Sequence, residues 1–231
     1  MFFETYHFLF RYLTIMEHVA FIGLGIVVAY LIGSMPTAVW YSRTYHGFDI
    51  RDHGSGNSGA TNTFRVLGKR AGTIVMLIDM IKGSIATLGA WVLMKQGSIV
   101  PEQLEIFKLI FGLVAVTGHV FPIYAHFKGG KGIATLLGMA VVLHPLAALS
   151  CATVFLAVLL MSKYVSLGSM LGTLTFPMVM ILIPTMRPDH NVVIWFGFAI
   201  FVLVMITHKK NIRRLINGEE NKTILIKKRG A

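Results

Sequence analysis

Two glycine-rich segments of the chain combine a permissive backbone with groups that bind anions. The first is GSGNSGATNTFR at residues 54–65, where Gly54, Gly56 and Gly59 let the backbone approach a ligand and point successive amides at it. It contains four neutral side chains that can donate hydrogen bonds: Ser55, Asn57, Thr61 and Asn62. It ends at Arg65, whose guanidinium can bind a phosphate bidentately. The composition predicts a phosphate-binding loop, and the alternative is a flexible turn.

The second segment, HFKGGKGIAT at residues 126–135, places lysines around a glycine pair. Gly129 and Gly130 precede Lys131, and Gly132 leads directly into an apolar helical run. A helix N-terminus beside lysines attracts anions through its free amides and its dipole. We therefore expect a second anion site here, since an ordinary basic loop would explain the lysines but not the glycines.

Three more candidates lie at the ends of predicted helices. Ser169, in YVSLGS, is three residues from Ser166 and shares its helix face, although helical serines often bond their own backbone. His208 and Asn211, in THKKNIRR, are also three apart on one face. His208 has a side chain suited to proton transfer near neutral pH. The alternative is that it is a solvated residue among the basic residues that follow the last span.

Asp79 and Lys82, in LIDMIKG, are charges inside an apolar span. Such charges are costly in a bilayer and usually face a polar interior as a pair. Their i, i+3 spacing allows direct contact. We interpret them as a structural ion pair that borders the site.

The elements that position these groups are membrane helices. Of 231 residues, 55% are hydrophobic and only 13% are charged, and the mean hydropathy is +0.70. Runs such as VAFIGLGIVVAYLIG predict an all-α integral membrane protein, so the net charge of +11 does not indicate nucleic-acid binding. About seven spans are expected, one or two of them short or broken at the HPL of residues 144–146; they lie near 19–42, 73–95, 105–124, 132–143, 146–161, 165–184 and 192–212.

The basic residues predict the orientation of the chain. Sixteen of its 21 Lys and Arg residues lie in segments 43–72, 125–131 and 162–164 and after residue 207. Four lie on the opposite side, and Lys82 lies within a span. Because cytoplasmic loops are enriched in Lys and Arg, the N-terminus is expected outside and the C-terminus inside. Both glycine-rich loops then face the cytoplasm.

Two basic loops on one side suggest two phosphate groups bound at the membrane surface, as in a lipid-synthesis enzyme that joins a phosphorylated headgroup to an acyl donor. The sequence has no acidic cluster typical of a metal site and no H-x-x-x-x-D acyltransferase motif. The rival functions are a transporter, which would place polar groups near mid-bilayer, and a lipid-binding protein without catalysis.

The motifs resemble those of the PlsY family, the bacterial acyl-phosphate:glycerol-3-phosphate acyltransferases. The resemblance runs in order through LIGSMPTAVW, GSGNSGATNTFRVLGKRAG, GHVFPIYAHFKGGKGIAT, YVSLGS and HKKNIRRLINGEE. The chain is thus expected to be a single membrane-embedded acyltransferase domain over residues 1–231. Residues 1–17 would be an N-terminal extension and residues 221–231 a basic tail.

The family implies transfer of a fatty acyl group from acyl phosphate to the 1-hydroxyl of glycerol 3-phosphate, with lysophosphatidic acid and phosphate as products. It implies no metal and no organic cofactor, a location in the bacterial inner membrane with a cytoplasmic active site, and a soluble phosphate acyltransferase that supplies the donor. The residues that match its functional positions are Ser55, Arg65, Lys131, Ser169, His208 and Asn211, with Glu220 in structural support.

Overall fold

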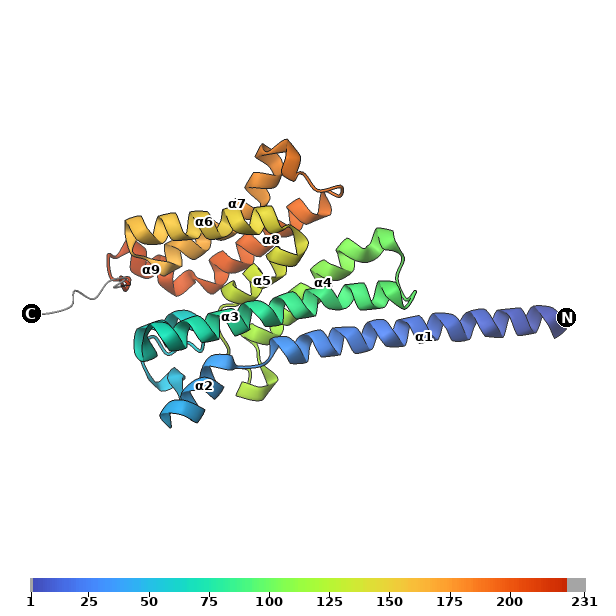
Figure 1. Cartoon of the computed structure of the whole chain (residues 1–231), viewed down its shortest axis with the longest axis horizontal. Coiled ribbons are helices and arrows are strands. Elements are labelled where there is room, and N and C mark those ends of the chain that lie inside the picture. The colour runs from blue at the N-terminus through green and yellow to red at the C-terminus, as the bar shows by residue number, and fades with distance from the viewer. Residues whose placement is uncertain (1, 224–231) are drawn as a thin grey trace, which may run out of the picture.

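The computed structural model describes the backbone of residues 2–223 and the side chains from residue 11 onward, and within these limits it is helical throughout (Figure 1). The helices are α1 (Phe2–Gly33), α2 (Thr37–His46), α3 (Ala60–Lys95), α4 (Leu104–Val120), α5 (Ile133–Leu143), α6 (Pro145–Ser162), α7 (Val165–Leu182), α8 (Val192–Thr207) and α9 (Lys209–Ile216). Short 3₁₀ turns lie between them: η1 (Ile50–Asp52), η2 (Pro101–Gln103), η3 (Ile123–Ala125) and η4 (Pro184–Met186).

The first predicted span, 19–42, is wrong at both ends. Its helix starts at Phe2, so the part of the expected extension that the structure describes belongs to α1. The helix ends at Gly33 and a separate helix starts at Thr37. Pro36 explains this break, because proline lacks the amide that a helix needs and disfavours helical geometry in the residue before it.

Two other boundaries also differ from the sequence prediction. Helix α3 starts at Ala60 rather than near 73 and passes through a non-helical Gly68 with φ 86°. Arg65 therefore lies on a helix and not in a loop. The last span was expected to continue to residue 212, but a bend of 65° at His208 separates α8 from α9.

The break between α5 and α6 is where the sequence predicts it. The His144 ring Nδ1 accepts a hydrogen bond of 3.2 Å from the Ala147 amide, and Pro145 occupies the first turn of α6. A side-chain cap followed by proline is a favourable way to start a helix.

Within the described part of the chain, five helices are long and apolar enough to cross a membrane, and the bent pair α8–α9 makes a sixth when counted as one span. Helix α5, with 11 residues, is shorter than the roughly 20 residues that a span requires. Each of the seven predicted segments thus corresponds to an apolar helix, and one of the seven is too short to span.

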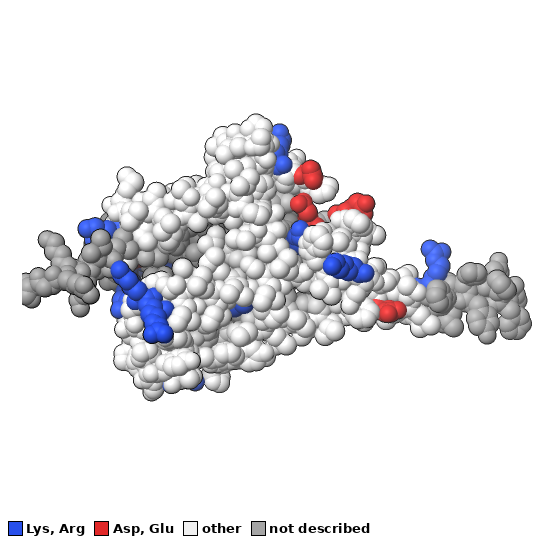
Figure 2. All heavy atoms as spheres, viewed as in Figure 1, with Lys and Arg blue, Asp and Glu red and all other residues white. Residues whose placement is uncertain are grey.

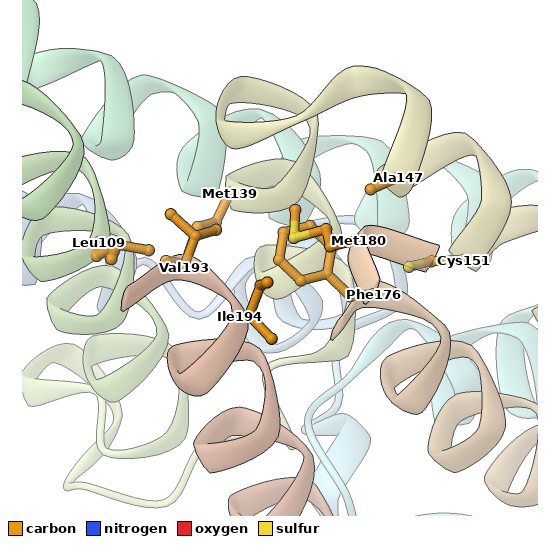
Figure 3. Packing of buried hydrophobic residues seen from close by; sticks show 8 residues of the cluster. All are labelled: Leu109, Met139, Ala147, Cys151, Phe176, Met180, Val193 and Ile194. Atoms are coloured by element: carbon orange, nitrogen blue, oxygen red, sulfur yellow. The ribbon is translucent and has the colours of Figure 1, made fainter. Parts of the chain in front are cut away.

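Helix packing relies on small residues and on several apolar clusters. The pairs α6–α7, α3–α5 and α1–α4 pack most extensively. A Cβ on Gly138 would lie 1.9 Å from the Met80 carbonyl oxygen, so only glycine lets α5 approach α3 this closely. The largest core cluster joins α4 to α8 through Leu109, Met139, Phe176, Met180, Val193 and their neighbours (Figure 3).

The polar connections lie at the end of the bundle opposite the N-terminus. Figure 1 shows the segment between α2 and α3, the α6–α7 turn and α9 at this end. In Figure 2 the acidic residues in view lie in the half toward the N-terminus, whereas the charged residues in view at the opposite end are Lys and Arg. The fold thus gathers basic side chains from distant parts of the chain.

Candidate active site

Lys131 and Asn211 join the second glycine-rich loop to the last helix. The Lys131 Nζ donates to the Asn211 Oδ1 across 80 positions of sequence. Gly132 adopts a left-handed φ of 78° at the N-cap of α5, which turns the chain so that the loop enters the helix directly after Lys131. The structure therefore brings together two residues that the sequence predicted as site members.

Glu220 connects this pair to α7. Its Oε1 accepts 2.7 Å from the Asn211 Nδ2 and 2.8 Å from the Ser166 hydroxyl. Glu220 thus supports Asn211 directly. Ser166, which the sequence analysis did not select, contacts this network. The selected Ser169 is buried and donates 2.9 Å to the Val165 carbonyl of its own helix.

The cationic side chains of Arg65 and Arg214 lie near enough to Lys131 to affect its pKa. Burial and, to a smaller extent, the positive charges of Arg214 and Arg65 together lower the pKa of Lys131 to about 8, against the opposing effect of Glu220. Arg65 is exposed near the start of α3, so its guanidinium is accessible. Clustered cations of this kind are stabilised by a bound anion.

His208 lies at the bend between α8 and α9, and only 2% of it is exposed. Its Nδ1 lies 2.9 Å from the Val204 carbonyl oxygen. Because a carbonyl can only accept, Nδ1 must carry the proton, and the Nε2 of the neutral ring has the free lone pair. The ring is therefore held in one tautomer with a potential proton acceptor.

The first glycine-rich loop is organised around Asn62. This buried side chain donates to the Ile50 and His53 carbonyls at 3.1 and 2.9 Å, and its Oδ1 accepts from both the amide and the hydroxyl of Ser55 at 2.8 and 3.1 Å. Asn62 was predicted to bind substrate, but its amide groups bond the loop itself. Gly54 and Gly56 adopt left-handed φ values of 64° and 73°, as the tight path requires.

The remaining candidates of this loop differ in their access to solvent. Thr61 is exposed and Asn57 is half-buried. Ser55 is exposed as well, and its hydroxyl oxygen has lone pairs left to accept further hydrogen bonds. Together with Arg65 on the following helix, these side chains can reach a ligand that sits on the loop.

Gly129 and Gly130 have a different role from the one expected. Their amides donate to the Val120 and His119 carbonyls at 3.1 and 3.2 Å, so these amides are not free for a phosphate. A Cβ would lie 2.0 Å from the His119 carbonyl oxygen at Gly129 and 2.3 Å from the His119 Nε2 at Gly130. Glycine is needed here because the loop packs tightly against the end of α4.

The predicted ion pair between Asp79 and Lys82 is confirmed, with 2.9 Å between Oδ1 and Nζ and almost no exposure. The same carboxylate oxygen accepts 3.0 Å from the Thr37 hydroxyl and lies 3.7 Å from the His119 Nδ1. The Lys82 ammonium also donates 2.8 Å to the Met35 carbonyl. The pair therefore links α3 to the break between α1 and α2.

A sequence model of the glycerol-3-phosphate acyltransferase family matches residues 23–218. The chain belongs to the glycerol-3-phosphate acyltransferase family. A relative of that name from Chlorobium phaeobacteroides (strain BS1) is 40% identical over 222 residues, which covers 85% of this chain and 94% of the relative. The family resemblance seen in the motifs is thus confirmed.

Solved structures of this acyltransferase family share the fold. The glycerol 3-phosphate form of PlsY (YgiH), described as an integral membrane glycerol 3-phosphate acyltransferase, has a TM-score of 0.73 and 34% identity over 88% of this chain and 96% of that one. Its lysophosphatidic acid form has a TM-score of 0.71 and 32% identity, over 88% and 95% of the two chains. This acyltransferase is therefore an all-helical membrane protein of the PlsY type.

The family match contains every predicted site residue except Glu220. The candidate residues come from separate parts of the chain: the first loop with the start of α3, the second loop, and the α8–α9 bend. Within the part of the chain that the structure describes, no three His, Cys, Asp or Glu side chains gather as metal ligands would.

Proposed function

We propose that this acyltransferase moves a fatty acyl group from acyl phosphate to the 1-hydroxyl of glycerol 3-phosphate, releasing lysophosphatidic acid and inorganic phosphate. The observation that carries the proposal is the contact of Lys131 with Asn211 beside Arg65. Lys131 in the second loop and Arg65 at the start of α3 provide positive charge from two separate segments for two anionic reactants. The glycerol 3-phosphate and lysophosphatidic acid forms of PlsY support this choice, because those molecules would be one substrate and the product.

The proposed reaction needs no covalent enzyme intermediate. Acyl phosphate is a mixed anhydride, so its carbonyl carbon is already activated. The 1-hydroxyl oxygen attacks this carbon, the bond from carbon to the phosphate oxygen breaks, and phosphate leaves with the electron pair. The protein then supplies mainly position and charge, with Arg65 and Lys131 neutralising the phosphates.

Ser55 is poorly placed to act as an acylated nucleophile. A serine nucleophile needs a base that accepts its proton. The Ser55 hydroxyl instead donates to the amide oxygen of Asn62, which is not a base. This geometry favours direct transfer, with the Ser55 hydroxyl oxygen left to accept a hydrogen bond from substrate.

His208 is the proposed acceptor of the hydroxyl proton. The competing acceptor is an oxygen of a substrate phosphate. The Val204 carbonyl fixes the Nδ1–H tautomer, and this leaves the Nε2 of His208 free to act as a base. That arrangement is the feature that favours the imidazole.

We further propose that the site faces the cytoplasm from the bacterial inner membrane, with the N-terminus outside. Most Lys and Arg residues lie in the segments at the end of the bundle that carries the site, and this distribution supports the orientation through the positive-inside rule. A soluble phosphate acyltransferase would then deliver the acyl phosphate from the same compartment. The part of the basic C-terminal tail after residue 223 lies outside the described residues.

The decisive experiment supplies the purified protein with acyl phosphate and labelled glycerol 3-phosphate in the presence of a chelator. Labelled lysophosphatidic acid should form together with one phosphate per turnover, and acyl-CoA should not replace the donor. Lys131→Ala should abolish most of this activity, whereas Lys95→Ala, at the exposed end of α3 far from the site, should not. Product formation with acyl-CoA but not with acyl phosphate would refute the assignment of the donor.

A further inference from the structure

Arg51 connects the two glycine-rich loops. It lies in η1, just before the first loop, and its NH1 donates 3.0 Å to the Ala125 carbonyl and 3.5 Å to the Lys128 carbonyl. Ala125 ends η3, and Lys128 directly precedes the glycine pair of the second loop. One guanidinium therefore spans two segments that are more than 70 positions apart in sequence.

The guanidinium of Arg51 is held by Asp49 and is not a free phosphate ligand. Its NH2 lies 2.7 Å from one Asp49 carboxylate oxygen, and its Nε lies 3.0 Å from the other. The Arg51 amide also donates 2.9 Å to this carboxylate. The hydrogen bonds from Arg51 hold the pKa of Asp49 well below its usual range, so the carboxylate stays charged near neutral pH.

The backbone that carries Arg51 is held by burial and hydrogen bonds of the neighbouring Ile50. Ile50, next to Arg51, is fully buried, and its amide donates 3.1 Å to the buried Ser42 hydroxyl. Its carbonyl accepts 3.1 Å from Asn62, the residue that also bonds Ser55. Arg51 thus projects from the same framework that shapes the first loop.

The other end of the connection lies close to the site. Lys128 is three residues before Lys131, and between them Gly129 and Gly130 are packed against α4 with both amides bonded. A restraint on the Lys128 carbonyl consequently limits the path of the chain that leads to Lys131.

We propose that Arg51 is a positioning residue that fixes the separation of the two anion-binding loops, so that the phosphates of both reactants are held in register. This inference rests on the proposed function for its catalytic consequence. A reaction between two bound molecules depends steeply on their relative placement, and a misplacement near 1 Å costs about 100-fold in rate.

Arg51→Ala should therefore lower kcat/KM by about 10- to 100-fold. Arg51→Lys should recover only part of this loss, since an ammonium cannot bond Asp49 bidentately and still reach the second loop. The matched control is Arg43→Ala. Arg43 pairs with the same carboxylate at 2.8 Å, but it is largely exposed and, among the described residues, bonds no carbonyl of the second loop.

Hydrogen–deuterium exchange of residues 126–132 provides a measurement that does not depend on the reaction. Arg51→Ala should accelerate exchange there, at the bonded Gly129 and Gly130 amides, and Arg43→Ala should not. Unchanged exchange in Arg51→Ala would overturn the inference, whether or not activity falls. Should the unsubstituted protein fail the acyl phosphate assay, the proposed function would fail while the exchange comparison would still test the restraint. If Arg51→Ala does not fold, Arg51→Lys serves for both measurements.

Discussion

Asn211 donates a 2.7 Å hydrogen bond to Glu220, and its amide oxygen at the same time accepts from Lys131. The amide is thereby fixed in one orientation between an anion and a cation. This arrangement explains how a residue after the last helix can affect a lysine that is distant in sequence.

Glu220→Gln should weaken this orientation without removing the side chain. The amide oxygen can still accept from both Asn211 and Ser166, but it loses the charge that strengthens these bonds, which is worth about 1 to 2 kcal/mol. We expect kcat/KM to fall about tenfold and the melting temperature to drop. Steady-state kinetics and thermal unfolding check this, with the exposed neighbour Glu219→Gln as the control. Equal effects of the two variants would contradict the role of Glu220.

His208→Gln tests the proton acceptor. Loss of a general base should lower kcat by about 10²- to 10⁴-fold and leave the KM for glycerol 3-phosphate nearly unchanged. His190→Gln, an exposed histidine at the far end of the molecule, should have no effect. A raised KM with retained kcat would instead make His208 a binding residue and leave the proton to a substrate phosphate.

Gly54→Ala tests the packing of the first loop against Asn62. A Cβ at this position would lie 2.3 Å from the Asn62 Oδ1, the atom that bonds both groups of Ser55. Gly47→Ala is the matched control, because Gly47 has a similar φ of 72° but open space around it. Both variants carry about 1 to 2 kcal/mol of backbone strain.

The backbone strain is common to both glycine variants, so a difference between them reports the contacts of the added Cβ. We expect kcat/KM to fall at least tenfold in Gly54→Ala and less than threefold in Gly47→Ala, measured with both substrates. If the two variants lose activity equally, strain alone accounts for the loss, and contact with Asn62 is irrelevant.

The sequence predicts those features of this molecule that depend on local pattern. Hydropathy locates the seven apolar helices, and the i, i+3 spacing of Asp79 and Lys82 is enough to predict their contact. The break at Pro36 is equally local, but the long apolar run across it hid the signal. The grouping of basic loops at one end follows from their alternation with the spans.

Features that depend on partners far along the chain could not be predicted. Whether Ser166 or Ser169 reaches the site depends on where Glu220 folds back, 54 positions after Ser166. The amides of Gly129 and Gly130 look free in sequence, and only the packing of their loop on α4 uses them. Arg51 looks like an ordinary basic residue of a cytoplasmic loop until its carbonyl partners are known.

Cysteine labelling tests the proposed orientation. In a Cys151→Ala background, Gln96→Cys adds a thiol at the end of the bundle near the N-terminus, and Asn217→Cys adds one after α9. Both positions are exposed. A membrane-impermeant maleimide added to intact cells should label the first variant, and the second only after permeabilisation. Labelling of Asn217→Cys in intact cells would place the site on the opposite side of the membrane.

The pKa of Lys131 predicts the alkaline limit of activity. Burial and the nearby arginines lower this pKa to about 8, so the ammonium that we propose binds phosphate is lost as the pH rises through that value. We expect kcat/KM to be constant below about pH 8 and to fall above it. A bound phosphate stabilises the ammonium, so kcat should fall only at a higher pH than kcat/KM.

Lys131→Arg separates this titration from other alkaline effects. A guanidinium stays charged throughout the range, so this variant should have lower activity but no fall in kcat/KM near pH 8. The substrate phosphates titrate near pH 6 and do not interfere, and hydrolysis of the donor is measured without enzyme at each pH. If the Lys131→Arg profile falls at the same pH as that of the unsubstituted protein, another group sets the limit, and Lys131 does not bind phosphate through its charge.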